Sequence, residues 1–139
     1  MRQLFLTLLC AFSLFANEFD WLTDYKAALK EAKEQKKNIY MLITSENCRW
    51  CKKLEATTLQ SESVLAKLKK SYVLLHINRD RDYIPSRYTV KGVPRHYFIT
   101  PGEEEIYQFL GYWNEEDFLS YVDDANKEYR QKFKYKTKE

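Results

Sequence analysis

Four runs of apolar residues along the chain have the length and the β-branched, aromatic composition of strands. Residues 38–44 (NIYMLIT) and 72–78 (YVLLHIN) are almost continuously apolar, which is typical of strands covered on both faces. Residues 95–100 (RHYFIT) form the third run, and residues 105–110 (EIYQFL) follow it after a Pro-Gly turn. This pattern predicts four strands, with the last two joined as an antiparallel hairpin.

Between these runs, apolar residues recur at the spacing of amphipathic helices. A first helix is predicted to start at the capping residue Asp20 and to include Trp21 and Leu22 among its apolar positions. A second is predicted from Cys48 to about Thr58. Strand, helix and strand in this order imply a right-handed parallel crossover. The sequence therefore predicts an α/β fold with a central mixed four-stranded sheet flanked by helices on both sides.

Capping residues mark two further helices. Ser61 precedes helical turns with inward-facing apolar positions, and Asn114 precedes Asp117 in an arrangement like a capping box. The charged chain from Lys127 onward is expected to fray. A chain of 139 residues that is 45% hydrophobic and 31% charged has the size and composition of one globular domain. We place this domain at residues 17–139, with a charged C-terminal helix and tail.

Residues 1–16 differ from the rest of the chain. Arg2 is followed by an apolar run and then by polar residues, an order typical of a secretory signal peptide. An uncleaved anchor or a buried N-terminal helix is the alternative. Removal of the signal peptide would also remove Cys10 and leave one close pair, Cys48 and Cys51. We therefore expect an exported, periplasmic protein whose two cysteines form a redox pair.

The strand-to-helix junction at Cys48 carries the candidate chemistry. A cysteine at a helix N-terminus lies beside unpaired backbone N–H groups and the positive end of the helix dipole, and both stabilise a thiolate. Arg49 and Lys52 add positive charge nearby, and the pKa of cysteines at such sites falls to roughly 3.5–7.5. Cys48 is therefore predicted to attack. Cys51, one turn further and more buried, is predicted to resolve the mixed disulfide.

A Cys-x-x-Cys pair also occurs in zinc sites and as a structural disulfide. A zinc site needs about four ligands, and beyond the pair the mature chain offers only His76 and His96 among histidines. Covalent haem attachment requires a histidine where this chain has Lys52. A structural disulfide would close a very small loop and add little stability. We predict no metal and no cofactor other than the redox-active Cys48–Cys51 disulfide.

The sequence Gly92-Val93-Pro94 directly precedes the third apolar run. A trans proline at a strand edge is one interpretation of this position. A cis Val93–Pro94 bond would instead present the Val93 backbone beside the cysteines, where it could pair with an extended substrate segment. Val93 and Pro94 are therefore candidate substrate-binding residues.

The segments NIYMLITSENCRWCKK, RYTVKGVPRHYFI and TPGEEEIYQFLGY resemble the thioredoxin superfamily in order and spacing. The resemblance implies that Cys48 is the nucleophile, that Cys51 resolves and that Pro94 is cis. The segment that begins Cys-Arg-Trp-Cys-Lys and includes Glu55 is similar to periplasmic thioredoxin-like reductase domains, such as the C-terminal domain of the DsbD reductase. This likeness favours a reductase.

Two features depart from the thioredoxin pattern. Where thioredoxin has a buried aspartate that assists the resolving cysteine, this chain has Leu42. Glu46 or Glu55 could replace that carboxylate and tune the cysteine pKa, and a solvated surface position is the alternative for both. Arg49 and Trp50 stand between the cysteines. Trp50 is expected either to form an exposed substrate platform or to pack on its own helix.

These features predict an exported thiol–disulfide oxidoreductase that reduces the disulfides of partner proteins. We expect a monomer that acts on exported proteins with disulfides and is recharged by a membrane or periplasmic thiol reductase. The alternatives are a disulfide oxidase or isomerase, and a non-catalytic thioredoxin-fold chaperone or assembly module. The net charge is only +3 and the basic residues are spread along the chain, which gives no support for a nucleic-acid partner.

Overall fold

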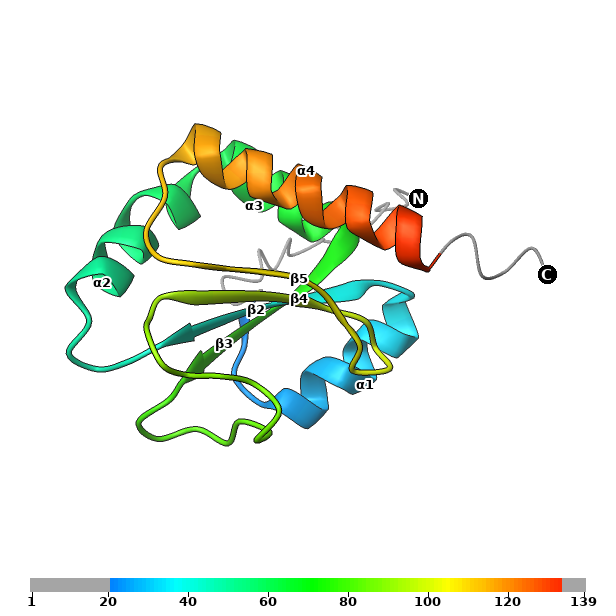
Figure 1. The fold of residues 1–139 in the computed structure, drawn as a ribbon, viewed down its shortest axis with the longest axis horizontal. Coiled ribbons are helices and arrows are strands. Elements are labelled where there is room, and N and C mark those ends of the chain that lie inside the picture. The colour runs from blue at the N-terminus through cyan, green and yellow to red at the C-terminus, as the bar shows by residue number, and fades with distance from the viewer. Residues whose placement is uncertain (1–20, 134–139) are drawn as a thin grey trace, which may run out of the picture.

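A mixed sheet forms the centre of the fold (Figure 1). The structure is a computed structural model that describes residues 21–133. Five strands form one sheet, and their bounds are β1 (Trp21–Leu22), β2 (Asn38–Thr44), β3 (Tyr72–Asn78), β4 (Arg95–Ile99) and β5 (Glu105–Leu110). Their order across the sheet is β1-β3-β2-β4-β5. The predicted α/β class and mixed sheet are confirmed, and the sheet has one strand more than predicted.

The lengths of the connections account for two of the pairings, the parallel pair β2–β3 and the antiparallel pair β4–β5. β2 and β3 are parallel, and β1 is parallel to β3. β4 is antiparallel to β2, and β5 is antiparallel to β4. A helix can return the chain for a parallel pairing, whereas a short turn allows only the antiparallel one. β2 is buried at every position, as its almost continuously apolar sequence predicts.

The predicted start of the first helix is wrong. Trp21 and Leu22 are extended and pair with Leu74 and Leu75 at the edge of the sheet. The helix α1 (Tyr25–Gln35) begins after Asp24, whose carboxylate accepts a hydrogen bond from a backbone N–H of the first turn at 2.7 Å. Pairing with β3 keeps Trp21 and Leu22 in the sheet, so the helix begins only after them. Asp20 and the predicted signal peptide, residues 1–16, lie outside the described residues.

Helices cover the two faces of the sheet unequally. α1 packs alone on one face through its buried residues Tyr25, Ala28 and Ala32. The other face is covered by α2 (Arg49–Ala56), the 3₁₀ turn η1 (Thr58–Gln60), α3 (Glu62–Ser71) and α4 (Glu115–Lys132). Figure 1 shows α1 on one side of the strands, and α3 and α4 on the other. No helix within residues 21–133 is long and apolar enough to cross a membrane.

The caps of the later helices are as predicted, but one helix end is not. Ser61 caps α3 and Asn114 caps α4, each by accepting a backbone N–H of the first turn. The expected fraying from Lys127 is wrong, because α4 continues through Lys132. Tyr129 stacks on the ring of Phe133 there, with the ring centroids 5.5 Å apart. Apolar surface in the last turns therefore holds the charged segment in the helix.

Candidate active site

Four segments meet at one end of the sheet. Thr44 at the end of β2 pairs with Asn78 at the end of β3. β4 starts at this same end, because Arg95 pairs with Ile43. Arg95 also pairs with Leu110, the last residue of β5. The turn that leads to the cysteines, the proline before β4 and the loop after β5 therefore all leave the sheet together.

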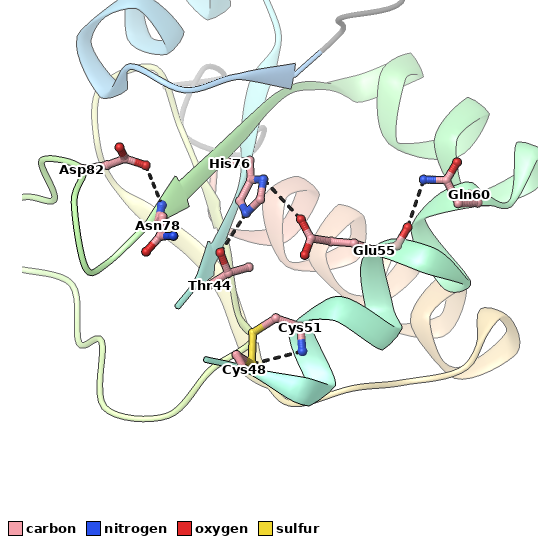
Figure 2. Close-up of polar contacts among 8 residues, drawn as sticks. All are labelled: Thr44, Cys48, Cys51, Glu55, Gln60, His76, Asn78 and Asp82. Carbon is pink, nitrogen blue, oxygen red and sulfur yellow. Dashed lines mark hydrogen bonds and ion pairs between the residues drawn. A yellow bond between two sulfur atoms is a disulfide. The ribbon is translucent and has the colours of Figure 1, made fainter. Parts of the chain in front are cut away.

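The two cysteines form a disulfide at the start of α2 (Figure 2). Cys48 is the N-cap residue, and its sulfur accepts a hydrogen bond from the Cys51 backbone N–H at 3.0 Å. Cys48 is 8% exposed and Cys51 only 1%, so the first cysteine is the more accessible to another protein. The N–H that now faces the Cys48 sulfur would also stabilise its thiolate once the bond is reduced.

Trp50 lies beside the disulfide and is still 46% exposed. Its ring packs on Tyr112, with the centroids 5.7 Å apart. The Arg49 guanidinium lies 5.1 Å from the Trp50 ring centroid. The Lys53 ammonium lies 5.3 Å from the Trp50 ring and 4.6 Å from the Tyr112 ring. Trp50 thus packs partly on the loop after β5, has a cation from each of two neighbouring residues over its ring, and remains half exposed next to the cysteines.

The Val93–Pro94 bond is cis. Hydrogen bonds connect Pro94 to the loop after β5, and that loop to the core. The Gly111 N–H donates to the Pro94 carbonyl at 2.8 Å. The Gly111 carbonyl lies 2.9 Å from Nε2 of His96, and Nδ1 of His96 lies 2.7 Å from the Tyr40 hydroxyl. The loop after β5 and the segment before β4 are therefore tied to the core through one histidine.

His96 is completely buried, and burial lowers its pKa to about 3. The ring is therefore neutral and carries one proton. A carbonyl only accepts hydrogen bonds, so Nε2 donates to Gly111 and Nδ1 accepts from the Tyr40 hydroxyl. The ring also stacks on Phe109, with a centroid separation of 4.0 Å. His96 is thus a neutral structural clamp on the loop that carries Tyr112.

A second polar group lies on the far side of α2 from the exposed tryptophan. Glu55 is four residues after Cys51, so the two residues share one face of the helix. Oε1 of Glu55 lies 3.5 Å from Nδ1 of His76 on β3, and Nε2 of His76 lies 2.8 Å from Oγ1 of Thr44 (Figure 2). Leu42, which stands where thioredoxin has its buried aspartate, lines the same cavity as Glu55 and His76.

The remaining candidate residues have simpler environments. Glu46 is exposed, and its backbone N–H donates to the Asp80 carboxylate at 2.8 Å. This bond ties the turn before Cys48 to the loop after β3. Lys52 is exposed on α2. Of the two carboxylates considered as replacements for the missing aspartate, Glu55 therefore has a titratable partner close by, whereas the Glu46 turn is held through its backbone.

Comparison with known families agrees with this geometry. A model described as thioredoxin-like matches residues 20–101. The chain belongs to this thioredoxin-like family. The family assignment and the Cys48–Cys51 disulfide together support a thiol–disulfide oxidoreductase in general terms. No curated protein sequence matches the chain significantly.

Solved structures with the same fold include several thioredoxin-like proteins. A thioredoxin from Thermus thermophilus is 23% identical over 76% of this chain and 85% of that one, with a TM-score of 0.67. The oxidised C-terminal domain of DsbD from Neisseria meningitidis is 17% identical over 71% of this chain and 90% of that one, with a TM-score of 0.60. The periplasmic thioredoxin SoxS from Paracoccus pantotrophus is 14% identical over 66% of this chain and 98% of that one, with a TM-score of 0.55.

Sequence reasoning missed three residues of this thioredoxin-like site. Tyr112 and Lys53 complete the surface around Trp50, and His76 is the partner of Glu55. Lys53 stands three residues after Trp50, a helical spacing that could have indicated the contact. Tyr112 and His76 come from other strands and loops. His76 was placed in a core strand from its apolar neighbours, and nothing local distinguishes it from a core histidine.

Proposed function

We propose that this chain is an exported reductase of disulfides in partner proteins. The observation that carries the proposal is the placement of Cys48. Its sulfur caps α2 and faces a backbone N–H that stabilises negative charge, and Cys48 is the more exposed residue of the pair. A thiol in that position attacks as a thiolate near neutral pH. The disulfide pair itself is the only redox group that the proposal requires.

In the proposed reaction, the Cys48 thiolate attacks one sulfur of a partner disulfide. A mixed disulfide forms, and the other partner sulfur leaves as a thiolate with the electron pair of the broken bond. Cys51 then loses its proton and attacks the Cys48 sulfur. The Cys48–Cys51 disulfide forms, and the second partner sulfur leaves. Two electrons pass from the cysteine pair to the partner, and an upstream thiol reductase returns them.

Substrate binding is proposed to use the two surfaces that flank the disulfide. The Val93 backbone would pair with an extended partner segment in the manner of a strand. The exposed part of Trp50, with the Arg49 guanidinium over its ring, would contact the partner's side chains. Because these contacts come from the backbone and from one aromatic surface, they would admit many sequences around an accessible disulfide.

Glu55 is proposed to take up the proton that Cys51 releases. The carboxylate lies one helical turn beyond Cys51 on the same face, and it is partly exposed. It would thereby serve in place of the aspartate that Leu42 replaces. Arg49 and Lys52 would stabilise the Cys48 thiolate by their charge, since both lie in the first turn after it.

Export rests on the apolar segment within residues 1–16 and on the periplasmic relative SoxS. The direction of electron flow rests on the likeness to the DsbD C-terminal domain, which is known in an oxidised and a reduced form. Exported proteins with disulfides would be the substrates. A membrane or periplasmic thiol reductase would supply electrons, and we propose that the chain acts as a monomer.

The test is a trapping experiment in the native host. Cys51→Ser leaves Cys48 able to attack but removes the resolving thiol, so partners should accumulate as mixed disulfides on Cys48. Cys48→Ser in the same background is the matched control and should trap nothing. If Cys51→Ser is folded and exported but captures no partner, the exchange mechanism is wrong.

The reduction potential decides the direction. A reductase should have a potential near that of thioredoxin, about −270 mV, whereas a value near that of DsbA, about −120 mV, would indicate an oxidase. A Cys48→Ser, Cys51→Ser double variant that keeps its biological activity would instead indicate a chaperone or assembly role. The potential can be measured by equilibration with a defined glutathione buffer, and activity by complementation of a deletion strain.

A further inference from the structure

A histidine links the end of the sheet to the helix that carries the cysteines. His76 lies on β3, with Nε2 2.8 Å from the hydroxyl of Thr44 on β2 and Nδ1 3.5 Å from the carboxylate of Glu55 on α2 (Figure 2). Glu55 and His76 border a cavity of about 310 Å³, which is large enough for several water molecules. Polar side chains here can therefore exchange protons with water as well as with one another.

The hydrogen-bond chemistry of these groups suits a ring that gains and loses a proton. A hydroxyl both donates and accepts. The Thr44 hydroxyl can therefore donate to Nε2 of a neutral His76, whose proton then faces Glu55 from Nδ1. When both ring nitrogens are protonated, the same hydroxyl can accept. The imidazole can thus gain or lose a proton while it keeps its contacts with both Thr44 and Glu55.

Other charges around His76 come from the loop after β3. Burial lowers its pKa, nearby Glu55 and Asp82 oppose that shift, and Arg81 adds to it. Trp21 on β1 contributes an uncharged ring at a centroid distance of 6.3 Å. Of the side chains that act on the ring, Glu55 is the one that also belongs to the helix of the cysteines. A change of charge on His76 is therefore felt directly by the group proposed to receive the Cys51 proton.

We propose that His76 is a positioning residue for Glu55, and that the two side chains act as one proton-accepting unit for the Cys51 thiol. The inference deepens the proposed function and rests on it. In the resolving step, the proton of Cys51 passes to the Glu55–His76 pair. The Cys51 thiolate attacks the Cys48 sulfur, the Cys48–Cys51 bond forms, the bond to the partner breaks, and the partner sulfur leaves as a thiolate.

The direction of the pH effect follows from the charge of the pair. While His76 is neutral, the pair carries one negative charge, and an added proton gives a neutral combination of carboxylate and imidazolium. Once His76 is already protonated, the next proton must neutralise the carboxylate and leave a net positive charge. The pair is then a weaker base. The resolving step should therefore slow as pH falls through the titration of His76, while the attack by Cys48 should not follow that titration.

Stopped-flow mixing of the reduced protein with excess 5,5′-dithiobis(2-nitrobenzoate) separates the two steps. Attack by Cys48 releases the first coloured thiolate at a rate that depends on reagent concentration. Attack by Cys51 on the resulting mixed disulfide releases the second at a rate independent of it. Cys51→Ser should show only the first phase, which identifies the second. Both rates are measured from about pH 5 to about pH 8.

His76→Gln can still bond to Thr44 but cannot take up a proton. We expect its second phase to be about tenfold slower at pH 8, because a change of about one pKa unit in the proton acceptor corresponds to a factor of ten. The second phase should also lose the wild-type dependence on pH. His76→Lys places a permanent positive charge beside Glu55 and should be slow throughout the range. Glu55→Gln should slow the second phase on the order of 10²-fold. Glu62→Gln, an exposed carboxylate on α3, is the control and should change neither phase.

A His76→Gln or His76→Lys variant whose second phase keeps the wild-type rate and pH profile would overturn the inference. Far-UV circular dichroism and urea unfolding show whether each variant is folded, so a loss of the second phase alone in a folded variant cannot come from unfolding. If the wild-type protein lacks even the first phase, the nucleophilic role of Cys48 is wrong, and the proposed function fails rather than the role of His76.

Discussion

At the scale of single residues, the two histidines of the chain have opposite environments. His96 is fully buried, and its two ring nitrogens form hydrogen bonds with the Tyr40 hydroxyl and the Gly111 carbonyl rather than with a carboxylate. His76 is partly exposed and lies beside Glu55. Complete burial with no carboxylate partner disfavours a charged ring at His96, whereas a carboxylate beside the ring favours the second proton at His76. The same residue type therefore clamps a loop in one place and can exchange a proton in the other.

The buried histidine predicts how stability depends on pH. The pKa of His96 is about 3 in the folded protein and about 6.5 in an unfolded chain. Below about pH 6.5 the unfolded state therefore binds a proton that the folded state does not, and the free energy of unfolding should fall as pH decreases from about 6.5 toward about 3. The lowered pKa of His76 acts in the same direction.

His96→Phe tests this linkage by urea unfolding between pH 4 and pH 7. The variant should lose roughly 1–3 kcal/mol for each of the two buried groups left without a partner, and its remaining stability should vary less with pH than that of the wild type. His76→Gln is the comparison for the second histidine. Parallel curves for His96→Phe and the wild type would show that His96 does not contribute the pH dependence.

The sequence identifies residues whose chemistry is local and misses those whose partners come from elsewhere in the fold. Cys48 and Cys51 could be found because their spacing on one helix is sufficient. Trp50 could be named, but its contact Tyr112 lies on a loop more than sixty positions away. His76 had no local signal, because its significance depends on Glu55 reaching it from another element. Lys53, whose contact with Trp50 is local, could have been found; for Tyr112 and His76, distance along the chain limits what the sequence predicts of the site.

At the scale of elements, apolar runs predict strands better than caps predict helix starts. The bounds of β2, β3 and β5 are those predicted, because each run is bounded by polar or turn residues. The predicted start of α1 at Asp20 is wrong. The actual start depends on the pairing of Trp21 with Leu74, a contact between distant segments. The pairing of β1 with β3 thus outweighs the helical spacing of the apolar residues in the local sequence.

The caps themselves can be tested by substitution. Asp24→Ala removes the acceptor for the first-turn N–H of α1 and should cost about 1 kcal/mol of stability, the usual effect of losing an N-cap. Asn114→Ala should cost a similar amount at α4, where the Asn114 side chain likewise accepts the N–H of the third helical residue. Lys26→Ala on the exposed face of α1 is the control. Urea unfolding at neutral pH measures all three.

An Asp24→Ala variant as stable as Lys26→Ala would mean that α1 begins elsewhere in solution. Far-UV circular dichroism distinguishes the two explanations for a destabilised variant. Loss of a cap should leave the helical signal of the folded protein unchanged, whereas a shift of the helix start would alter it.

At the scale of the whole molecule, the two faces of the sheet have different relations to the site. The face under α2, α3 and α4 contains Leu54 from the cysteine helix and Phe118 from α4 in one core cluster. Phe118 also contacts the ring of His96, with a centroid distance of 5.7 Å. The face under α1 has its own cluster, centred on residues such as Ile39. Packing on the first face is therefore continuous with the loop that flanks the disulfide.

This asymmetry predicts that equally buried substitutions will affect activity differently. Phe118→Ala should cost about 3–5 kcal/mol and Ile39→Ala about 2–5 kcal/mol, since both side chains are fully buried. Only Phe118→Ala opens a cavity beside His96. It should therefore weaken the hydrogen bond between His96 and Gly111 and lower the rate of disulfide exchange, while Ile39→Ala keeps that rate in the molecules that remain folded.

Urea unfolding gives the stabilities of the two variants. Exchange with a model disulfide at low temperature, corrected for the folded fraction, gives the rates. Equal rates for the two variants would mean that the core supports the site only by keeping the chain folded.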